Sequence, residues 1–413
     1  MVRVLTNCRA VATPLGRRPV GGAAMARLHE VADAAVVIDD DGLILEVGPA
    51  AKVKAPPGAE GLDAGGALVL PGLVDPHTHA VYAGDRSFEV EHKVAGKSYL
   101  DIQQLGGGIH HTVAETRRAS IDTLVEGGRR RLDEMLRQGT TTAEVKSGYG
   151  LDTESEVKVL RAVERLRVEA TVDVVPTLLA AHVVPREFER ARDVFVSMVV
   201  TEMIPTVVRE SLATFVDVWC DEGAFTADEC RPMLEAGARA GLGLRVHADE
   251  FARAGGAGLA AELHASSADH LLFATRDDFR LLQEASVVPV LPPAAPLVTL
   301  LHRWPDARQL IADEVAFALA TDFNPNCQLS SMQRAMALAV YQMRCPPRAA
   351  LTAATLNAAC SLGRGDTVGS VEPGKVADLL LVDAPSVDAF VTDLSANRVV
   401  GVLRKGVPVV RAP

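Results

Sequence analysis

Eight short apolar segments alternate with amphipathic helical patterns through the middle of this chain, and this alternation limits the possible fold more than any other feature. The predicted strands end near His79, Ser147, His182, Cys220, Glu250, His270, Pro292 and Phe323. Helical patterns between them include residues 121–138, 153–167 and 188–210. A (β/α)8 TIM barrel requires eight strand-then-helix units, so the sequence predicts an α/β fold of this type.

A doubly wound open sheet is the alternative to the barrel. That fold binds phosphates through a glycine-rich loop between a strand and a helix. Here the consecutive glycines Gly106 to Gly108 follow a helix-like stretch and lack the G-x-x-x-x-G-K context. The barrel is therefore favoured, and it predicts that catalytic groups lie at the carboxyl ends of the strands.

Both ends of the chain are rich in strand signals. Residues 34–48 form two strand patterns joined at Asp41 and Gly42, which tolerate the positive φ angles of a tight hairpin. Residues 369–383 form a turn and a strand, and residues 399–410 form a second hairpin pattern. The predicted domains are the N-terminal part of a composite β-sandwich, the barrel and the C-terminal part of the sandwich, at residues 1–70, 71–365 and 366–413.

Charge argues against a nucleic-acid partner. The 413-residue chain has a formal net charge of -11, and its densest basic run, Arg129 to Arg131, lies in a helical pattern. Such a run is typical of a solvated helix face. Without a long basic cluster, the chain offers no surface suited to a polyanion.

Segments that would direct the chain to a membrane or an export pathway are not expected. Arg3 and Arg9 interrupt the apolar residues at the N-terminus, unlike a secretory signal. The longest uncharged run, residues 285–301, contains four prolines, which would disrupt a membrane helix. The six cysteines show no C-x-x-C spacing. We therefore expect a cytoplasmic protein that acts on a small molecule.

Histidines and an aspartate at predicted strand ends form a candidate metal site. His77 and His79 are two residues apart after an apolar run, so both rings project from the same side of a strand. Such a pair can equally be a surface or turn pair when taken alone. His247 follows the fifth strand and Asp322 the eighth, although a core histidine and a helix N-cap are the alternatives. Together the four side chains suit Zn²⁺ or a similar ion.

A metal in this setting implies hydrolysis or deamination, because it acidifies water and polarises a carbonyl. Glu250 follows His247 by three residues, and His270 ends the next strand, so both can reach the reacting atoms as acid or base. Asp322 can also hydrogen-bond the attacking water and transfer its proton. A salt bridge to a barrel arginine is the alternative for Glu250.

These motifs resemble those of the amidohydrolase superfamily. The similarity rests on P-G-L-V-D-P-H-T-H at 71–79, H-A-D-E at 247–250, Asp322 and G-S-V-E-P-G-K-V-A-D-L at 369–379. Further segments are similar to the imidazolonepropionase family, namely G-D-R-S-F-E at 84–89, Y-L-D-I-Q-Q-L-G-G-G-I at 99–109, E-V-K-S-G-Y-G-L-D at 144–152, A-A-H-V-V-P at 180–185, S-A-D-H-L-L at 267–272 and T-D-F-N-P-N at 321–326.

The resemblance implies a distorted TIM barrel with a β-sandwich domain composed of both termini. It also implies hydrolysis of 4-imidazolone-5-propanoate to N-formimidoyl-L-glutamate, in L-histidine degradation, by a metal-activated water. One divalent or trivalent ion per subunit is expected, zinc first and iron second, and a homodimer is expected from the resemblance alone. Binuclear relatives bridge two ions with a lysine that ends the fourth strand, whereas F-V-D-V-W-C at 215–220 contains none. Lys146, near the end of the second strand, is instead expected to be structural or close to the substrate.

Site residues carry over by the same resemblance. The metal ligands are His77, His79, His247 and Asp322, and the catalytic residues are Glu250, His270 and Asp322. Substrate-binding residues are Arg86, for the propanoate, and Tyr149, His182, Glu250, Asn324, Asn326 and Cys327. Many relatives carry Gly and then Ser or Thr in place of Asn326 and Cys327, so contact through side chain or backbone is left open there. Lys93 stands where Arg is frequent.

Two other functions fit part of the sequence. Another mononuclear amidohydrolase, such as an aromatic amine deaminase, would share the metal ligands and release ammonia. A catalytically silent metal-binding barrel would also keep the ligands. The presence of Glu250, His270 and Asp322 at strand ends argues against a silent barrel.

Overall fold

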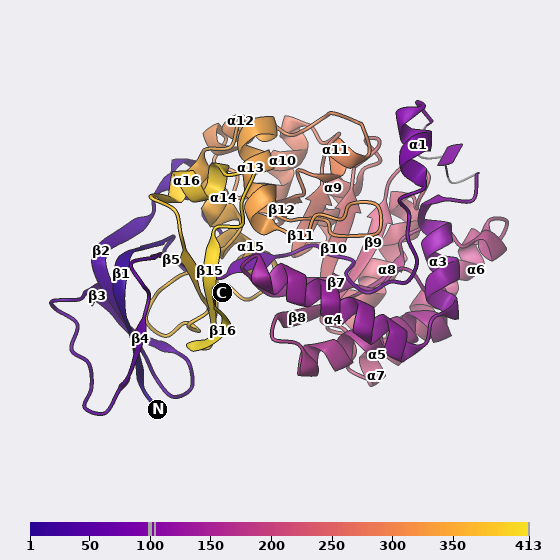
Figure 1. The fold of residues 1–413 in the computed structure, drawn as a ribbon. Helices are drawn as coiled ribbons and strands as arrows, with labels where there is room; N and C mark the ends of the chain where they lie inside the picture. Colours follow the sequence, from indigo (N-terminus) through magenta and orange to yellow (C-terminus); the bar gives the residue numbers. More distant parts are fainter. Residues whose placement is uncertain (98–100, 103–104, 412–413) are drawn as a thin grey trace.

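Two large sheets organise the protein, whose computed structural model describes residues 1–97, 101–102 and 105–411. The middle of the chain forms a parallel sheet of eight strands, and the two ends together form a mixed sheet. Figure 1 shows the indigo strand β1 (Arg3–Thr13) and the yellow strand β15 (Val399–Arg404) at one end of the molecule, beside the barrel. The predicted barrel with a small β domain from both termini is confirmed.

The barrel strands are adjacent in chain order, and each is parallel to the next. They are β6 (Leu73–Asp75), β7 (Thr140–Lys146), β8 (Asp173–Ala181), β9 (Phe215–Cys220), β10 (Gly243–Ala248), β11 (Ser267–His270), β12 (Val288–Leu291) and β13 (Ala318–Leu319). Beyond β6 and β13, a parallel bridge joins Thr78 to Phe323, and the His79 N–H donates to the Phe323 carbonyl at 2.8 Å. All eight predicted strands are present, although the first and eighth end earlier than predicted because only this bridge continues them.

Helices connect the barrel strands and cover the outside of the sheet (Figure 1). Their bounds are η1 (Gly22–Ala26), α1 (Glu89–Val94), α3 (Gly108–Arg118), α4 (Ile121–Arg137), α5 (Thr153–Glu169), η2 (Arg186–Phe188), α6 (Arg192–Met198), η3 (Val199–Met203), α7 (Ile204–Arg209), α8 (Ala227–Arg239), α9 (Gly256–Glu262), α10 (Arg276–Glu284), α11 (Ala295–Val298), α12 (Ala307–Ala312), α13 (Met332–Met343), α14 (Pro347–Ala353), α15 (Leu356–Ser361) and α16 (Val387–Thr392). The helices predicted at 121–138 and 153–167 are confirmed as α4 and α5.

The helix predicted at 188–210 is divided into three parts: α6, the π-helical segment η3 and α7. Pro205 near the start of α7 provides the physical reason. A proline donates no backbone hydrogen bond, and its ring crowds the carbonyl four residues earlier. A wider π turn before the proline relieves this conflict.

The mixed sheet has the strand order β16-β15-β14-β5-β1-β2-β3, with β4 paired to β1. The remaining strands are β2 (His29–Ile38), β3 (Ile44–Pro49), β4 (Glu60–Asp63), β5 (Leu68–Pro71), β14 (Leu379–Val382) and β16 (Val407–Arg411). Both predicted hairpins are present, and Gly42 adopts φ 84° in the first. The domain limits at 70/71 and 365/366 stay predictions.

Strand β5 connects the two ends of the chain and leads directly into the barrel. It pairs parallel with β1 and antiparallel with β14. Gly72 then separates β5 from β6, and a Cβ atom here would lie 2.2 Å from Oγ1 of Thr141 on β7. Only glycine allows this close approach without movement of the neighbouring strand. The segment that carries the first two histidines is therefore anchored in both sheets.

The barrel strands are buried on both faces, as a parallel sheet covered by helices requires. Every residue of β7 and β9 is buried, and the interior nevertheless contains charged side chains, including Glu144, Lys146 and Asp217. No helix in the described part of the chain is both long and apolar enough to cross a membrane.

Candidate metal-dependent active site

The segment after β6 places His77 and His79 at the carboxyl end of the barrel. The Asp322 N–H donates to the His77 carbonyl at 3.2 Å, and the His79 N–H donates to the Phe323 carbonyl. These two hydrogen bonds join the first and last strands where both functional motifs lie. Ser331, rather than Asp322, is the N-cap of α13, so the alternative reading of Asp322 as a helix cap is wrong.

Three imidazole rings and a carboxylate converge at this end of the barrel. The ring centroid of His77 lies 5.3 Å from that of His79 and 4.5 Å from that of His247. Oδ1 of Asp322 lies 3.5 Å from Nε2 of His77 and 3.6 Å from Nε2 of His79. Potential ligand atoms of His77, His79 and His247 all lie within 4.8 Å of one another, as do those of His77, His270 and Asp322.

The free ring nitrogens show that this cluster fits a metal ion. Among the described residues, Nε2 of His77 and Nε2 of His247 are buried without a hydrogen-bond partner. Their other ring nitrogens are occupied, because Nδ1 of His77 lies 2.6 Å from Asp269 and Nδ1 of His247 lies 3.2 Å from Asp217. Metal-bound histidines characteristically donate their second ring N–H to a carboxylate in this way.

Burial keeps His77 and His79 in the neutral form that binds metals. It lowers the pKa of His77 and His79 well below the ordinary imidazole value. Neighbouring groups lower these pKa values further, Lys146 for His77 and His182 for His79. A neutral imidazole offers a lone pair for coordination, so His77 and His79 do not have to lose a proton before an ion binds.

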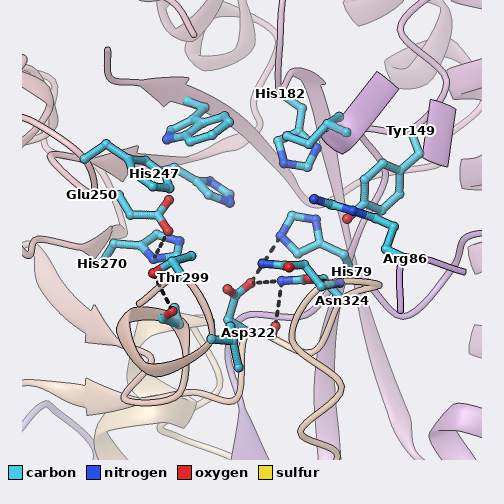
Figure 2. Close-up of a pocket in the computed structure, with 16 residues that line it drawn as sticks. His79, Arg86, Tyr149, His182, His247, Glu250, His270, Thr299, Asp322 and Asn324 are labelled. Carbon is cyan, nitrogen blue, oxygen red and sulfur yellow. Dashed lines mark hydrogen bonds and ion pairs between the residues drawn. The ribbon is translucent and has the colours of Figure 1, made fainter. Parts of the chain in front are cut away.

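Glu250 and His270 form one wall of the pocket above the cluster. Nδ1 of His270 lies 3.6 Å from Oε1 of Glu250, and Figure 2 shows the two side chains facing each other. Asp221 fixes the turn that carries Glu250, because it accepts hydrogen bonds from the N–H groups of Phe251 at 2.9 Å and Ala252 at 3.0 Å. Burial, and then the nearby Asp322, raises the pKa of Glu250 well above its ordinary value.

Arg86 lies on the opposite wall together with Tyr149 and His182 (Figure 2). Glu89 fixes the guanidinium through two hydrogen bonds, at 2.8 Å to Nε and 3.0 Å to Nη2. Nδ1 of His182 lies 3.0 Å from the Gly148 carbonyl, and its ring stacks on His79 at a centroid distance of 5.0 Å. The wall thus contains a guanidinium paired with a carboxylate, and its side chains are held in place by buried contacts.

The loop after β13 is organised around Asn324. Its Nδ2 donates to Oδ1 of Asp322 at 3.0 Å, and its Oδ1 accepts the N–H of Asn326 at 2.7 Å and that of Cys327 at 2.9 Å. Lys93 donates to the Asn326 side chain. Cys327 is 1% exposed, and its Sγ lies 3.7 Å from the Thr321 carbonyl. The structure thus places Asn326 in the pocket wall and buries Cys327 behind it.

Comparison with known proteins identifies the family. The model of the amidohydrolase family matches residues 68–409. The imidazolonepropionase of Thermoanaerobacter pseudethanolicus is 42% identical over 97% of this chain and 96% of the relative. That of Haloarcula marismortui is 44% identical over 92% and 90% of the two chains. This chain belongs to the imidazolonepropionase family of amidohydrolases.

Solved structures support the same fold for this amidohydrolase. The guanine deaminase of E. coli superposes with a TM-score of 0.76 at 14% identity, and the match covers 100% of both chains. The ochratoxinase of A. niger gives a TM-score of 0.69 at 17% identity. At such low identities the likeness concerns the fold alone.

The structure brings together most of the residues predicted for the amidohydrolase site. The pocket, about 490 Å³ including its open mouth, is lined by the predicted residues His79, Arg86, Tyr149, His182, His247, Glu250, His270, Asp322, Asn324 and Asn326. His77 is 0% exposed beneath them. Part of the motif at 99–109 lies outside the described residues.

Sequence reasoning missed several residues of the pocket wall, including Trp219, Phe251 and Thr299. The period-two pattern of β9, in which Trp219 follows the inward-facing Asp217 by two residues, could have indicated the first. Thr299 follows α11 in the proline-containing run at 285–301, where no periodicity points to a site. Asp217 and Asp269 were also missed as partners of the histidines.

Proposed function

We propose that this amidohydrolase opens the ring of 4-imidazolone-5-propanoate with water to give N-formimidoyl-L-glutamate, a step of L-histidine degradation. The identity to imidazolonepropionases over nearly the whole chain carries this assignment. The pocket adds independent chemical support, since it places an arginine opposite a metal-binding cluster. A substrate with both a carboxylate and a hydrolysable ring amide suits such a pocket.

His77, His79, His247 and Asp322 are the proposed ligands of one metal ion, with zinc as our first choice and iron as the alternative. Histidine nitrogens and a carboxylate oxygen are ligands that suit zinc, and a water could join these four ligands if the ion becomes five-coordinate. When bound, the ion would polarise the ring carbonyl and lower the pKa of water. Asp217 and Asp269 would orient two of the ligand rings through their Nδ1 atoms.

Arg86 would bind the propanoate carboxylate and set the orientation of the ring. A guanidinium held by Glu89 is already oriented and loses little freedom when substrate binds. Tyr149 and His182 lie beside Arg86, and Asn324, Asn326 and Cys327 form the loop at the edge of the pocket. We propose side-chain contact for Asn326 and backbone contact for the buried Cys327.

Proton transfer would fall to the groups around the reacting carbonyl. The oxygen of water joins the carbonyl carbon, the C–N bond of the ring amide breaks, and the departing nitrogen takes a proton. Asp322 is placed to accept a proton from water and return it to that nitrogen. His270 would donate a hydrogen bond to the oxygen that gains negative charge, and Glu250 would hold a ring N–H.

A purified-protein assay tests this function directly. Loss of the imidazolone absorbance after zinc or iron is supplied, without release of ammonia, is the expected result. No decay with any added metal would overturn the assignment, and ammonia release from an aromatic amine would favour a deaminase. The names of the relatives do not favour the deaminase, and the guanine deaminase likeness concerns only the fold.

The cellular location and the oligomeric state of the enzyme are part of the same proposal. A cytoplasmic location is inferred from the cysteine pattern, and all six cysteines are free in the structure. We also propose a homodimer on the basis of the family resemblance. Sedimentation of the purified protein at twice the mass of one chain would support it, and sedimentation as a monomer would contradict it.

A further inference from the structure

Five charged side chains lie inside the barrel, directly beneath the proposed metal ligands. All are 0% or 1% exposed, and they come from four of the five consecutive strands β7 to β11. The group, which we name the buried ion network, consists of Glu144 and Lys146 on β7, Asp217 on β9, Arg245 on β10 and Asp269 on β11. The mechanism above uses only the two aspartates of this network.

Lys146 is the centre of the buried ion network. Its Nζ donates to Oε1 of Glu144 at 2.9 Å and to Oδ2 of Asp217 at 2.7 Å, and it lies 3.8 Å from Oδ2 of Asp269. One ammonium group therefore lies between the two carboxylates that accept hydrogen bonds from the histidine ligands. Arg245 donates to the same Oδ2 atom of Asp269 at 3.1 Å and to the Pro76 carbonyl at 2.7 Å.

Stability alone does not account for such a network. Removing five charged groups from water is costly, and well-packed apolar side chains in their place are often as stable or more stable. A network of this kind gives instead a fixed geometry, because each charged group has few favourable positions. Because the network lies beneath the proposed ligands, its fixed geometry is suited to orienting them.

We propose that Lys146 is a positioning residue for the metal site. By holding the carboxylates of Asp217 and Asp269, it fixes the Nδ1 hydrogen bonds of His247 and His77 and so directs both Nε2 atoms toward one ion. The inference rests on the ligand set proposed above. His79 differs, because its Nδ1 has no hydrogen-bond partner among the described residues.

Replacement of Lys146 by methionine tests the proposal, because it removes the charge while keeping an unbranched chain. We expect zinc to bind about 10- to 100-fold more weakly, as measured by competition with a chromophoric chelator. The visible spectrum of the cobalt-substituted variant should also change, since two ligand rings lose their fixed orientation. If the charge of Lys146 acted only by repelling the metal ion, its removal would instead strengthen zinc binding. Unchanged or tighter zinc binding would overturn the proposal.

A second variant keeps the proposal testable where Lys146→Met fails to fold. Asp217→Asn preserves the size of the side chain and an oxygen acceptor for Nδ1 of His247, but removes the charge that Lys146 holds. Weaker zinc binding and an altered cobalt spectrum are expected again. Wild-type affinity in a folded Asp217→Asn variant would contradict the proposed role.

Asp378→Asn provides a matched control in the mixed sheet. Asp378 directly precedes β14 and is 5% exposed. Its carboxylate accepts hydrogen bonds from Arg404 and from the Lys405 N–H, and it contacts none of the histidines that the structure describes. This variant should lose unfolding stability but retain the zinc affinity of the wild type. If it weakens zinc binding as much as Lys146→Met, general destabilisation explains both results and the proposal fails.

His79→Ala separates this proposal from the ligand set on which it rests. Loss of zinc from His79→Ala together with unchanged affinity in Lys146→Met would overturn the role of Lys146 alone. Full zinc affinity in His79→Ala would overturn the ligand set and, with it, the proposed metal-dependent reaction. Weaker binding in both variants is the outcome that supports the two proposals together.

Discussion

The two walls of the pocket differ in how their charges are arranged. On the Arg86 wall, a buried guanidinium is matched by Glu89 through two hydrogen bonds. On the Glu250 wall, an acid and an imidazole face each other at 3.6 Å, and burial drives both toward their neutral forms (Figure 2). A paired and fixed charge suits recognition of a carboxylate, whereas neutral groups that exchange protons suit the chemical step.

Because the walls differ in this way, we expect mutations to separate substrate binding from the chemical step. Changes on the Arg86 wall should act mainly on KM, and changes on the Glu250 wall mainly on kcat. The metal cluster between the walls should affect both. The predictions below run from the largest expected effect to the smallest.

His247→Ala should remove one proposed ligand of the metal site that lies between the two walls. Without this ligand the protein should lose its metal, and activity should fall more than about 1,000-fold. Metal content measured by mass spectrometry and decay of the imidazolone absorbance provide the two readouts. Activity that survives without bound metal would refute the proposed ligand set, provided that circular dichroism shows a folded variant.

Glu250→Gln should lower kcat by about 100-fold or more with little change in KM, because the variant keeps the size of the side chain but cannot exchange a proton with the ring N–H that Glu250 is proposed to hold. Steady-state kinetics with metal-loaded protein measures this. Thr299→Ala offers a control on the same side of the pocket, since Thr299 lines the pocket without an assigned role. If KM rose by as large a factor as kcat fell, the Glu250 wall would contribute to substrate binding as well as to the chemical step, and the proposed difference between the walls would be wrong.

Arg86→Gln should raise KM by about 10- to 100-fold, because the propanoate loses a charged, two-pronged partner. Arg86→Lys serves as the matched variant. It leaves Glu89 with a cation but lacks the planar fork, so it should recover only part of the affinity. Equal and full activity of both variants would show that the carboxylate binds elsewhere.

The segment that follows Glu250 should be sensitive to acid, because it forms a salt bridge with a carboxylate of low pKa. Arg253, three residues after Glu250, donates to Asp278 at 2.8 and 3.0 Å. Burial raises the pKa of Asp278, but hydrogen bonds from Arg253 and Thr275 outweigh this effect and bring the pKa to about 2. The carboxylate therefore stabilises the fold above about pH 4, and this contribution is lost as the pH falls toward 2.

Asp278→Asn measures this smallest effect. Because Arg253 is well exposed, the pair should contribute only about 1 kcal/mol at neutral pH. Urea unfolding at several pH values should show the difference between wild type and variant shrinking as the solution is acidified. A difference that stays constant down to pH 3 would exclude Asp278 as the source.

The fold and the positions of the proposed ligand histidines were predictable because each rests on a local pattern. Eight apolar runs gave the barrel strands, and polar residues at their ends gave His77, His247 and Asp322. The break in the helix at 188–210 depended on one residue, Pro205, whose effect on a long amphipathic pattern is easily underestimated.

The parts that escaped prediction depend on contacts between distant strands. Asp217 and Asp269 look like ordinary polar residues in short strands, and only the packing of the barrel interior shows that they touch His247 and His77. Thr299 enters the pocket through an irregular segment. Such contacts have no periodicity in the sequence, so no local rule could identify them.

The pairing of β5 with β14 has a consequence for how the protein is made. During translation β5 leaves the ribosome with β1 available as a neighbour, but β14 is synthesised only after the whole barrel. Until then β5 presents an unpaired edge, which is prone to pairing with other chains. A nascent or truncated chain that lacks its last strands would thus expose this edge just beside the segment that carries the first two histidines.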